Sequence, residues 1–468
     1  MPTYRVHGGF IEFPDEYADR IGARVQTKRQ EAYEPNSKLF DYQRDITRMA
    51  IDKKKFCVFA DCGLGKTLIF LEFAKHCLNS TGKSVLIVSP LMVIPQTMRE
   101  AKVFYGDDYP EITQARAANL QPWLDQGSGI AITNFEAIRE DLRKGNIGTL
   151  IIDDSSMLKS HYGKWGTKLL ELGAGLEYKM ACTGTPAPND RIEYANHAVF
   201  MDAFPSVNAF LARFFVNRGQ TSERWEIKQH AVGAFYRALS HWSIFLSNPT
   251  TYGWEDNTKP LPPVHVHTHD VKMTDRQQEL AYDMTGELFA HKIGGIGSRS
   301  MLGQIAKGNY KGEDVPTNKP GFIKSLLESW PNESTIIWCL YNYEQEKLAN
   351  ILPKAASITG TTPNDERQRI IEEFKSGKIK TIITKPKILG FGLNLQVATR
   401  HIFSGLQDSY ESYYQAVKRS NRYGSKYPLN VHIPLTAIER PMIDTVLVKA
   451  DMIDKDTKAQ EALFSEVT

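Results

Sequence analysis

Cysteine is scarce in this chain, and long apolar runs are absent. None of the five cysteines forms a CxxC pair, which argues against a zinc site and against disulfides. No apolar run reaches the roughly 20 residues that a membrane helix needs, and the first residues lack the apolar core of a signal peptide. We therefore expect a soluble, cytoplasmic protein with reduced thiols. The cysteines are Cys57, Cys62, Cys77, Cys182 and Cys339.

An excess of charge of one sign is also missing. The 57 lysines and arginines nearly balance the 54 aspartates and glutamates, and the net charge is +3. This small positive charge does not by itself require a nucleic-acid partner. Any nucleic-acid binding must therefore come from a local groove. The length of 468 residues predicts about three domains.

The chain does contain a glycine-rich loop of the phosphate-binding kind. Residues 60–67 read ADCGLGKT, after an apolar run at 56–60 that predicts a buried strand and before an apolar-rich helical stretch at 67–75. Ala60 stands where the general pattern has its first glycine. A chance glycine turn is the alternative, but the strand, the spacing and the Lys-Thr ending favour a nucleotide site.

The residue types in this loop match the chemistry of a bound nucleotide. Gly63 and Gly65 allow successive N–H groups to converge on a phosphate at a helix N-terminus. Lys66 can then reach the β- and γ-phosphates, and the Thr67 hydroxyl can bind Mg²⁺. The loop therefore predicts ATP and Mg²⁺ as cofactors.

Buried-strand candidates recur in two groups along the chain. Short apolar runs alternate with helix-length stretches in both groups, which indicates an α/β layout with parallel sheets. Amphipathic stretches between the groups predict helices. The strand candidates are 84–90, 129–133 and 149–154 in the first group, and 334–340, 380–384 and 399–404 in the second.

This pattern divides the chain into five predicted parts, of which the second and fourth are the α/β lobes. The others are an N-terminal accessory segment, a helical insertion with a connector, and a helical tail that packs back on the core. In chain order the parts are residues 1–35, 36–200, 201–316, 317–440 and 441–468.

Three histidines alternate within the connector. His265, His267 and His269 fall on one face if this run is a strand. A metal site is one interpretation. Because no cysteine or carboxylate lies at ligand spacing, a partly exposed strand face is the favoured interpretation.

An acidic pair ends one of the strand candidates. Asp153 and Asp154 follow an apolar run, about ninety residues after the phosphate loop. One carboxylate at such a place can hold Mg²⁺, and a second can orient the attacking water. The alternative is that both are solvent-exposed carboxylates without a catalytic role, and the phosphate loop upstream disfavours it.

Several motifs in order resemble those of superfamily 2 helicases, and within them the Snf2-like DNA translocases. The resemblance extends from Lys38 to about Lys455 and implies two tandem RecA-like P-loop NTPase lobes with parallel sheets, plus the helical insertion. The matching segments are 39–43 (Gln motif), 60–67 (motif I), 88–90 (Ia), 133–136 (Ib), 152–160 (II), 183–189 (III), 390–396 (V) and 415–424 (VI).

The resemblance also implies roles for single residues around ATP. Tyr42 and Gln43 would stack on and recognise adenine, and Gly392 and Gln415 would contribute to the nucleotide site. Helix-surface positions are the ordinary alternative for the first two. ATP would sit between the lobes.

Two arginines and three polar residues complete the implied set. Arg419 and Arg422, about a helical turn apart, would act as arginine fingers, with a solvated basic helix as the alternative. Thr133, Thr185 and Asn394 would contact one nucleic-acid strand through its phosphates.

The sequence departs from the family pattern at two positions of motif II. Asp154 stands where the family usually has glutamate, and Ser156 replaces the usual histidine. An acid shorter by one methylene can place the base about 1 Å too far back, which costs on the order of a hundredfold in rate unless the backbone compensates. We expect hydrolysis to be retained, and Ser156 puts the relay to motif III in doubt.

These features favour a DNA-stimulated ATPase that translocates on duplex DNA. A strand-separating helicase on DNA or RNA is the second hypothesis. The third is an ATP-switched DNA-binding subunit that serves a separate nuclease or modification enzyme. The near absence of accessory modules suggests a bacterial cell or a virus-infected host cell as the setting.

Overall fold

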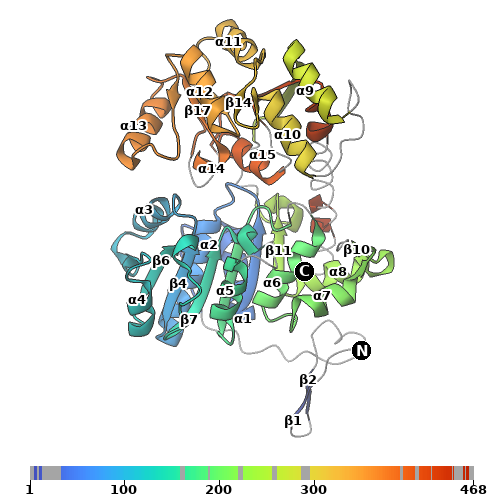
Figure 1. Ribbon diagram of the computed structural model, residues 1–468. Helices are drawn as coiled ribbons and strands as arrows, with labels where there is room; N and C mark the ends of the chain where they lie inside the picture. Colours follow the sequence, from blue (N-terminus) through green and yellow to red (C-terminus); the bar gives the residue numbers. More distant parts are fainter. Residues whose placement is uncertain are drawn as a thin grey trace. The chain divides into compact units, whose positions relative to one another are not determined.

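The computed structural model divides into two compact units, which are described separately. The first unit comprises Met1–Thr258 with Lys455–Thr468, and the second Lys259–Asp454 (Figure 1). None of the helices in the described part of the chain has the length and apolar character that a membrane span requires. The structure describes residues 5–7, 10–12, 33–158, 164–187, 190–219, 225–255, 261–285, 296–389, 394–405, 410–422, 424–444, 446, 457–458 and 460–462.

A seven-stranded parallel sheet forms the centre of the first unit, in the order β11-β3-β8-β7-β4-β6-β5. Most strands are buried along nearly their whole length, which explains why they read as continuous apolar runs. The strands are β3 (Lys55–Ala60), β4 (Ser84–Ser89), β5 (Ile112–Gln114), β6 (Ile130–Asn134), β7 (Ile147–Asp153), β8 (Tyr178–Thr183) and β11 (Ser243–Leu246).

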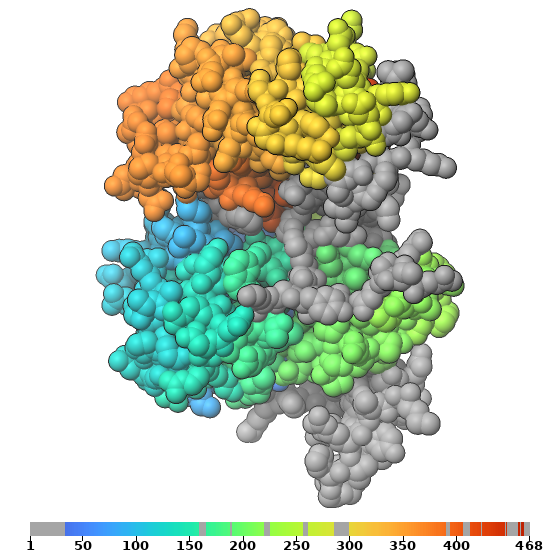
Figure 2. Space-filling model, in the orientation of Figure 1, coloured from blue at the N-terminus to red at the C-terminus, as the bar shows by residue number. Residues whose placement is uncertain are grey.

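Helices cover both faces of this sheet. One apolar cluster joins it to α1 (Asp41–Lys53), α2 (Lys66–Thr81) and α3 (Ile94–Tyr105). A second cluster joins its other face to α4 (Leu120–Gln126), α5 (Lys164–Gly173), α6 (Tyr194–Phe200), α7 (Val207–Phe214) and α8 (Val232–Ser240). At the surface of this unit, the cyan region with α3 and α4 and the green region with α7 and α8 lie on opposite sides (Figure 2).

The second unit is built on a six-stranded parallel sheet, in the order β12-β19-β18-β15-β17-β16. Its strands are β12 (Val264–Asp270), β15 (Thr335–Trp338), β16 (Ala356–Ser357), β17 (Thr381–Thr384), β18 (Arg400–Phe403) and β19 (Leu429–Leu435). The helices are α9 (Asp275–Thr285), α10 (Ile296–Ala306), α11 (Lys319–Ser329), α12 (Asn342–Ile351), α13 (Asn364–Lys375), α14 (Pro386–Leu389) and α15 (Tyr410–Val417). The two sheets confirm the prediction of two parallel α/β lobes.

The segment predicted as a helical insertion and connector, 201–316, is divided between the units. Its first part contributes α7 and α8 but also β11, which pairs with β3 and completes the first sheet. Its second part contributes β12, the edge strand of the second sheet. Both strands gain their hydrogen bonds from partners far away in sequence, and the local pattern does not show such pairing.

The predicted strand face of histidines is found on β12. The His267 and His269 rings each stack on His432 of β19, with centroids 4.8 and 5.2 Å apart. His269 Nε2 and His432 Nδ1 are 2.9 Å apart. β12 is therefore the partly exposed strand that the alternation predicts.

Both ends of the chain have short elements in the first unit. β1 (Arg5–His7) and β2 (Phe10–Glu12) form an antiparallel hairpin within the predicted accessory segment. Near the other end, the Glu461 carboxylate accepts hydrogen bonds from the main-chain N–H and the hydroxyl of Ser247 (2.7 Å for the hydroxyl). This contact fastens residues 460–462 beside the end of β11.

Candidate functional site

Most of the predicted residues of the first unit meet at one edge of its sheet. The phosphate loop follows β3, the acidic pair ends β7, and Thr183 ends β8, which lies between those two strands. Because all strands are parallel, their carboxyl ends share this edge, where open α/β sheets bind ligands.

The phosphate loop has the backbone that a phosphate cradle needs. Gly63 and Gly65 adopt φ angles of +92° and +70°, and α2 starts directly after Gly65. Lys66 Nζ donates to the main-chain oxygens of Ala60 (2.7 Å) and Asp61 (3.1 Å). The ammonium therefore lies over the loop on neutral acceptors, which a phosphate would replace with a stronger, charged one. Thr67 is the next residue of the helix, and its side chain is half-buried.

Gln43 at the start of α1 packs against this loop. Its Oε1 accepts the N–H of Phe40 at 3.0 Å, and its Nε2 lies 2.1 Å from where a Cβ atom on Gly65 would stand. The hydroxyl of Tyr42 donates to the main-chain oxygen of Leu64 (3.2 Å). The Gln motif is thereby joined to the phosphate loop within one unit.

The ring available for stacking differs from the one predicted. Tyr42 is only 1% exposed, whereas Phe40 is 37% exposed and stacks on it with centroids 5.9 Å apart. Tyr42 lies beneath the surface because it supports the phosphate loop from below. A flat ligand can reach Phe40, and Tyr42 is covered in this structure.

Asp153, the first carboxylate of the acidic pair, is buried, and its surroundings disfavour its negative charge. Asp153 Oδ2 accepts a hydrogen bond from the hydroxyl of Ser89 at the end of β4 (2.9 Å). Burial, and after it the neighbouring charge of Asp154, raise the pKa of Asp153 to about 6. A cation at this place would offset both effects, and a carboxylate is a ligand that Mg²⁺ prefers. Asp153 therefore has the environment expected of a Mg²⁺ ligand.

The second carboxylate occupies an unusual turn. Asp154 has a φ angle of +58°. Its Oδ1 accepts hydrogen bonds from Ser156 Oγ (2.9 Å) and from Thr183 Oγ1 (3.3 Å). Motif II and motif III are thus in direct contact through Asp154 and Thr183. The histidine that the family usually has at position 156 is not needed for this contact.

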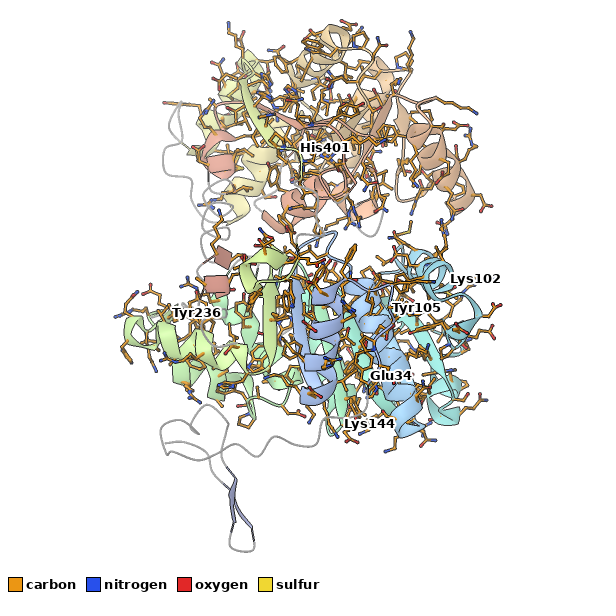
Figure 3. The ribbon with its side chains drawn as sticks, turned by 180° about the vertical axis from the view of Figure 1, so that it is seen from behind. Glu34, Lys102, Tyr105, Lys144, Tyr236 and His401 are labelled. Carbon is orange, nitrogen blue, oxygen red and sulfur yellow. The ribbon has the colours of Figure 1, made fainter. Side chains whose placement is uncertain are left out.

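The two arginines lie in a turn and not on a helix. α15 ends at Val417, and Arg419 and Arg422, both half-buried, follow it. The hydroxyl of Ser420, between them, contacts Nε2 of His401 inside the second unit (2.8 Å; His401 is labelled in Figure 3). Asn421 donates to the main-chain oxygen of Pro262 (2.7 Å). The N–H groups of Arg419 and Ser420 donate three residues back, to the main-chain oxygens of Ala416 and Val417, so the chain continues as turns where a helix was predicted.

Two neighbouring motifs of the second unit are also brought together. The N–H of Leu395 donates to the main-chain oxygen of Arg419 (2.9 Å), so the end of motif V lies against motif VI. Gln415 is buried within α15. The prediction for Gly392 lies outside the described residues.

The three predicted nucleic-acid contacts differ in exposure. Thr133 is fully buried and its hydroxyl donates to the main-chain oxygen of Ala115 (2.6 Å). Thr185 is 7% exposed, and its N–H donates to the hydroxyl of Thr183 (3.1 Å). Asn394 is exposed. Of the three side chains, only that of Asn394 lies open to a ligand in this structure.

Sequence reasoning missed a group of polar residues at the carboxyl edge of the second sheet. β16, β17 and β15 are neighbours, so the loops after them share one edge. The Lys385 ammonium donates to the side-chain oxygen of Asn342, which joins two of these loops. The sequence indicates these residues only through two polar segments that follow strands, Thr-Gly-Thr-Thr at 359–362 and Lys-Pro-Lys at 385–387. The residues are Tyr341, Asn342 and Tyr343 after β15, Thr359, Thr361 and Thr362 after β16, and Lys385 and Lys387 after β17.

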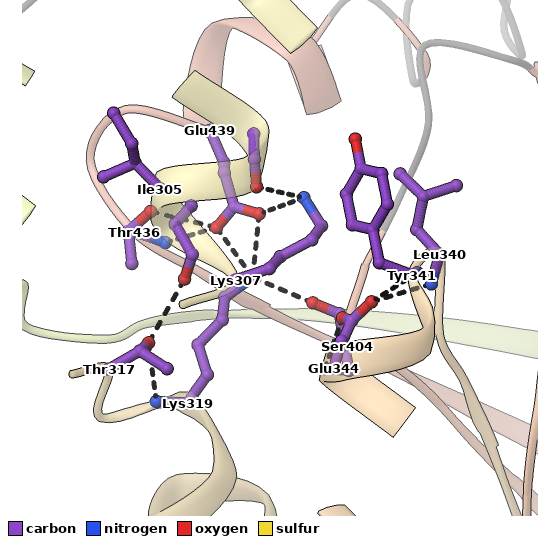
Figure 4. A network of polar contacts seen from close by, with 12 residues as sticks. Ile305, Lys307, Thr317, Lys319, Leu340, Tyr341, Glu344, Ser404, Thr436 and Glu439 are labelled. Carbon is purple, nitrogen blue, oxygen red and sulfur yellow. Dashed lines mark hydrogen bonds and ion pairs between the residues drawn. The ribbon is translucent and has the colours of Figure 1, made fainter. Parts of the chain in front are cut away.

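A buried ion network lies beneath these loops (Figure 4). Lys307, Lys319 and Glu439 are each at most 3% exposed, and the Glu439 carboxylate contacts both ammonium groups, at 2.9 and 2.7 Å. Burial raises the pKa of Glu439, but the two ammonium groups outweigh it and lower that pKa to about 2. The network fastens α10 and α11 to the turn after β19.

Glu344, at the start of α12, holds the loop after β15. Its carboxylate accepts hydrogen bonds from the N–H groups of Leu340 (2.7 Å) and Tyr341 (3.2 Å) and from the Ser404 hydroxyl (2.8 Å). Ser404 follows β18, the strand that leads to α15. One carboxylate thus links the polar edge to the segment before the arginine turn.

Two family models match this chain. The model of the SNF2-related domain matches residues 42–310, and the model of the helicase conserved C-terminal domain matches residues 318–424. The chain is 22% identical to the putative ATP-dependent helicase/translocase YwqA of Bacillus subtilis, over 88% of this chain and 47% of that protein. It is 21% identical to the ATP-dependent helicase FUN30 of Saccharomyces cerevisiae, over 93% and 48%.

The chain thus spans about half the length of these curated relatives. Among solved structures it matches a Sulfolobus solfataricus SWI2/SNF2 ATPase core in complex with double-stranded DNA. That match has 20% identity and a TM-score of 0.42, over 95% of this chain and 97% of the other.

Proposed function

The chain belongs to the SNF2-related family, and on that premise we propose that it is an ATPase that moves along duplex DNA. The main support is the carboxyl edge of the first sheet. Lys66 follows β3 there, Asp153 and Asp154 stand at the end of β7, and β8 lies between these two strands. A positive charge for phosphate, a cation ligand and a candidate base are the groups that phosphoryl transfer to water requires.

Each residue of this edge has a role in the proposal. Lys66 binds the β- and γ-phosphates, and Thr67 with Asp153 holds the Mg²⁺. Bound Mg²⁺ would neutralise charge that develops on the phosphates. Asp154 orients the attacking water, and Gln43 recognises adenine while Phe40 provides the stacking surface.

Residues of the second unit complete the proposed cycle. Arg419 and Arg422 act as arginine fingers that stabilise charge on the transferred phosphate. Gln415 and Gly392 support the nucleotide site, and Asn394 contacts a DNA phosphate. In this proposal, their engagement makes hydrolysis depend on DNA.

The polar edge of the second sheet supports DNA as the partner. Hydroxyl and ammonium groups at strand ends suit the phosphate backbone, which supplies most of the affinity of non-specific binding. A local site of this kind reconciles nucleic-acid binding with a net charge of +3. We propose the cytoplasm of a bacterial or virus-infected cell as the setting.

The test is ATP turnover with no nucleic acid, duplex DNA, single-stranded DNA or RNA. Duplex DNA should stimulate turnover most, and Lys66→Ala and Arg422→Ala should abolish the stimulation. Stimulation accompanied by strand displacement would favour a helicase instead. Tight ATP binding without turnover under any condition would favour an ATP-switched subunit of a nuclease or modification complex.

A further inference from the structure

The two residues at which motif II departs from the family pattern contact each other. Ser156 Oγ donates to Asp154 Oδ1 at 2.9 Å, and Thr183 Oγ1 donates to the same oxygen at 3.3 Å. Among the described residues, no hydrogen bond reaches Oδ2 of Asp154. Within the part of the chain that the structure describes, the carboxylate is thus held through Oδ1 alone.

The backbone under this carboxylate is in the left-handed region, with φ at +58°. Left-handed backbone is unfavourable for most side chains because Cβ approaches the following carbonyl oxygen, and Asp and Asn are the side chains that tolerate it. Glutamate is not among the side chains that tolerate this backbone. The turn at residue 154 thus favours the shorter acid for a local steric reason.

The turn is fastened from the other side as well. Ser155 Oγ lies 3.0 Å from Nε2 of His197 on α6, and both side chains are fully buried. Asn196, also on α6, donates to the main-chain oxygen of Leu158. Burial lowers the pKa of His197 to about 4, so this contact is made by a neutral imidazole. Residues 155–158 therefore cannot relax easily to suit a longer acid.

We propose that Ser156 is a positioning residue for the water-activating carboxylate, and that Asp154 and Ser156 replace the usual Glu and His as one fitted pair. The left-handed turn changes the direction of the Cα–Cβ bond, and Ser156 with Thr183 then fixes Oδ1 so that Oδ2 faces the attacking water. This inference rests on the proposed ATPase activity and deepens it. It also removes the main reason for expecting a weakened hydrolase, because the shorter side chain suits its own backbone.

The test compares wild type with Ser156→Ala, Ser156→Thr and Asp154→Glu at saturating duplex DNA. Ser156→Ala should lower kcat about tenfold, as expected for a lost hydrogen bond to a charged group, while the KM for ATP changes less than twofold. Ser156→Thr restores a hydroxyl and should recover most of the rate. Asp154→Glu should lower kcat on the order of a hundredfold, because its carboxylate is displaced by about 1 Å.

Ser325→Ala is a matched control, since that exposed hydroxyl donates only to the main-chain oxygen of Phe322. It should leave kcat unchanged. An active wild type whose kcat is unaffected by Ser156→Ala, or raised by Asp154→Glu, would overturn this inference and leave the proposed function intact. A wild type without turnover under any condition would overturn both.

A second measurement does not depend on activity. Asp154→Gly accepts the left-handed turn, whereas Asp154→Glu does not, so their melting temperatures should differ. We expect Asp154→Glu to melt below Asp154→Gly by on the order of 2–4 °C. Equal melting temperatures would show that the turn does not select the shorter acid.

Discussion

The Gln43 side-chain nitrogen lies 2.1 Å from the position that a Cβ atom on Gly65 would occupy. Two features therefore require glycine at position 65: the φ angle of +70°, and the Gln43 amide that leaves no room for a Cβ atom. The predicted adenine-recognition residue and the phosphate loop act as one packed unit.

Gly65→Ala should weaken ATP binding at least tenfold, because the loop must distort and the Gln43 amide must move. The double variant Gly65→Ala with Gln43→Ala should lose less than the sum of the two single losses in binding free energy, since contacting residues are not additive. Titration with a fluorescent ATP analogue measures both. Wild-type affinity in Gly65→Ala would contradict the packing argument.

Phe40→Ala should raise the KM for ATP about tenfold, since stacking on a base contributes about 1–3 kcal/mol. Tyr42→Phe keeps the ring but removes the hydrogen bond to Leu64, so it should lower the stability by about 1 kcal/mol and leave KM nearly unchanged. Steady-state kinetics and urea denaturation separate the two effects. A larger KM effect for Tyr42→Phe would return the adenine role to Tyr42.

Lys66→Ala should lower kcat by about 10²–10³, the loss seen when one preorganised charge or donor is removed from a reacting site. Lys83→Ala is the control, because Lys83 is exposed just beyond the end of the same helix, α2. ATP turnover with duplex DNA is the measurement. Similar rates in the two variants would exclude Lys66 from the mechanism.

Lys385→Ala should weaken duplex DNA binding and reduce the slope of log affinity against log salt by about one, because one phosphate contact is lost. Basal turnover without DNA should not change. Fluorescence anisotropy at several salt concentrations provides the slope. Lys375→Ala on α13, where the ammonium pairs with Glu372 at 2.9 Å, should leave the slope as in wild type.

Glu439→Gln should cost about 3–5 kcal/mol of stability at pH 7, because it leaves two buried ammonium groups without their carboxylate. The pKa of Glu439 is about 2 in the folded protein, below its ordinary value of 4.5. Its contribution is thus fully present above pH 4.5 and is lost as the pH falls toward 2.

Urea denaturation at several pH values measures this dependence. Wild type should lose stability between pH 4.5 and about 2 more steeply than Glu439→Gln. Glu372→Gln alters an exposed pair and should change stability by less than about 1 kcal/mol. Parallel pH profiles for wild type and Glu439→Gln would show that the network contributes little.

The sequence by itself determined the phosphate loop, the acidic pair and most of the parallel strands. These features are local, because a glycine loop before a helix and a run of apolar residues in a doubly covered sheet are both visible over a few positions. The order of motifs was also sufficient to indicate the family.

Only the tertiary structure decided which sheets β11 and β12 join, and that Phe40 and not Tyr42 reaches the surface. It alone placed Thr183 against Asp154 and Glu439 between Lys307 and Lys319. These contacts join residues that are 29 and more than 100 positions apart. Burial and hydrogen bonding at such separations depend on how distant segments pack, and no local pattern of residues encodes that packing.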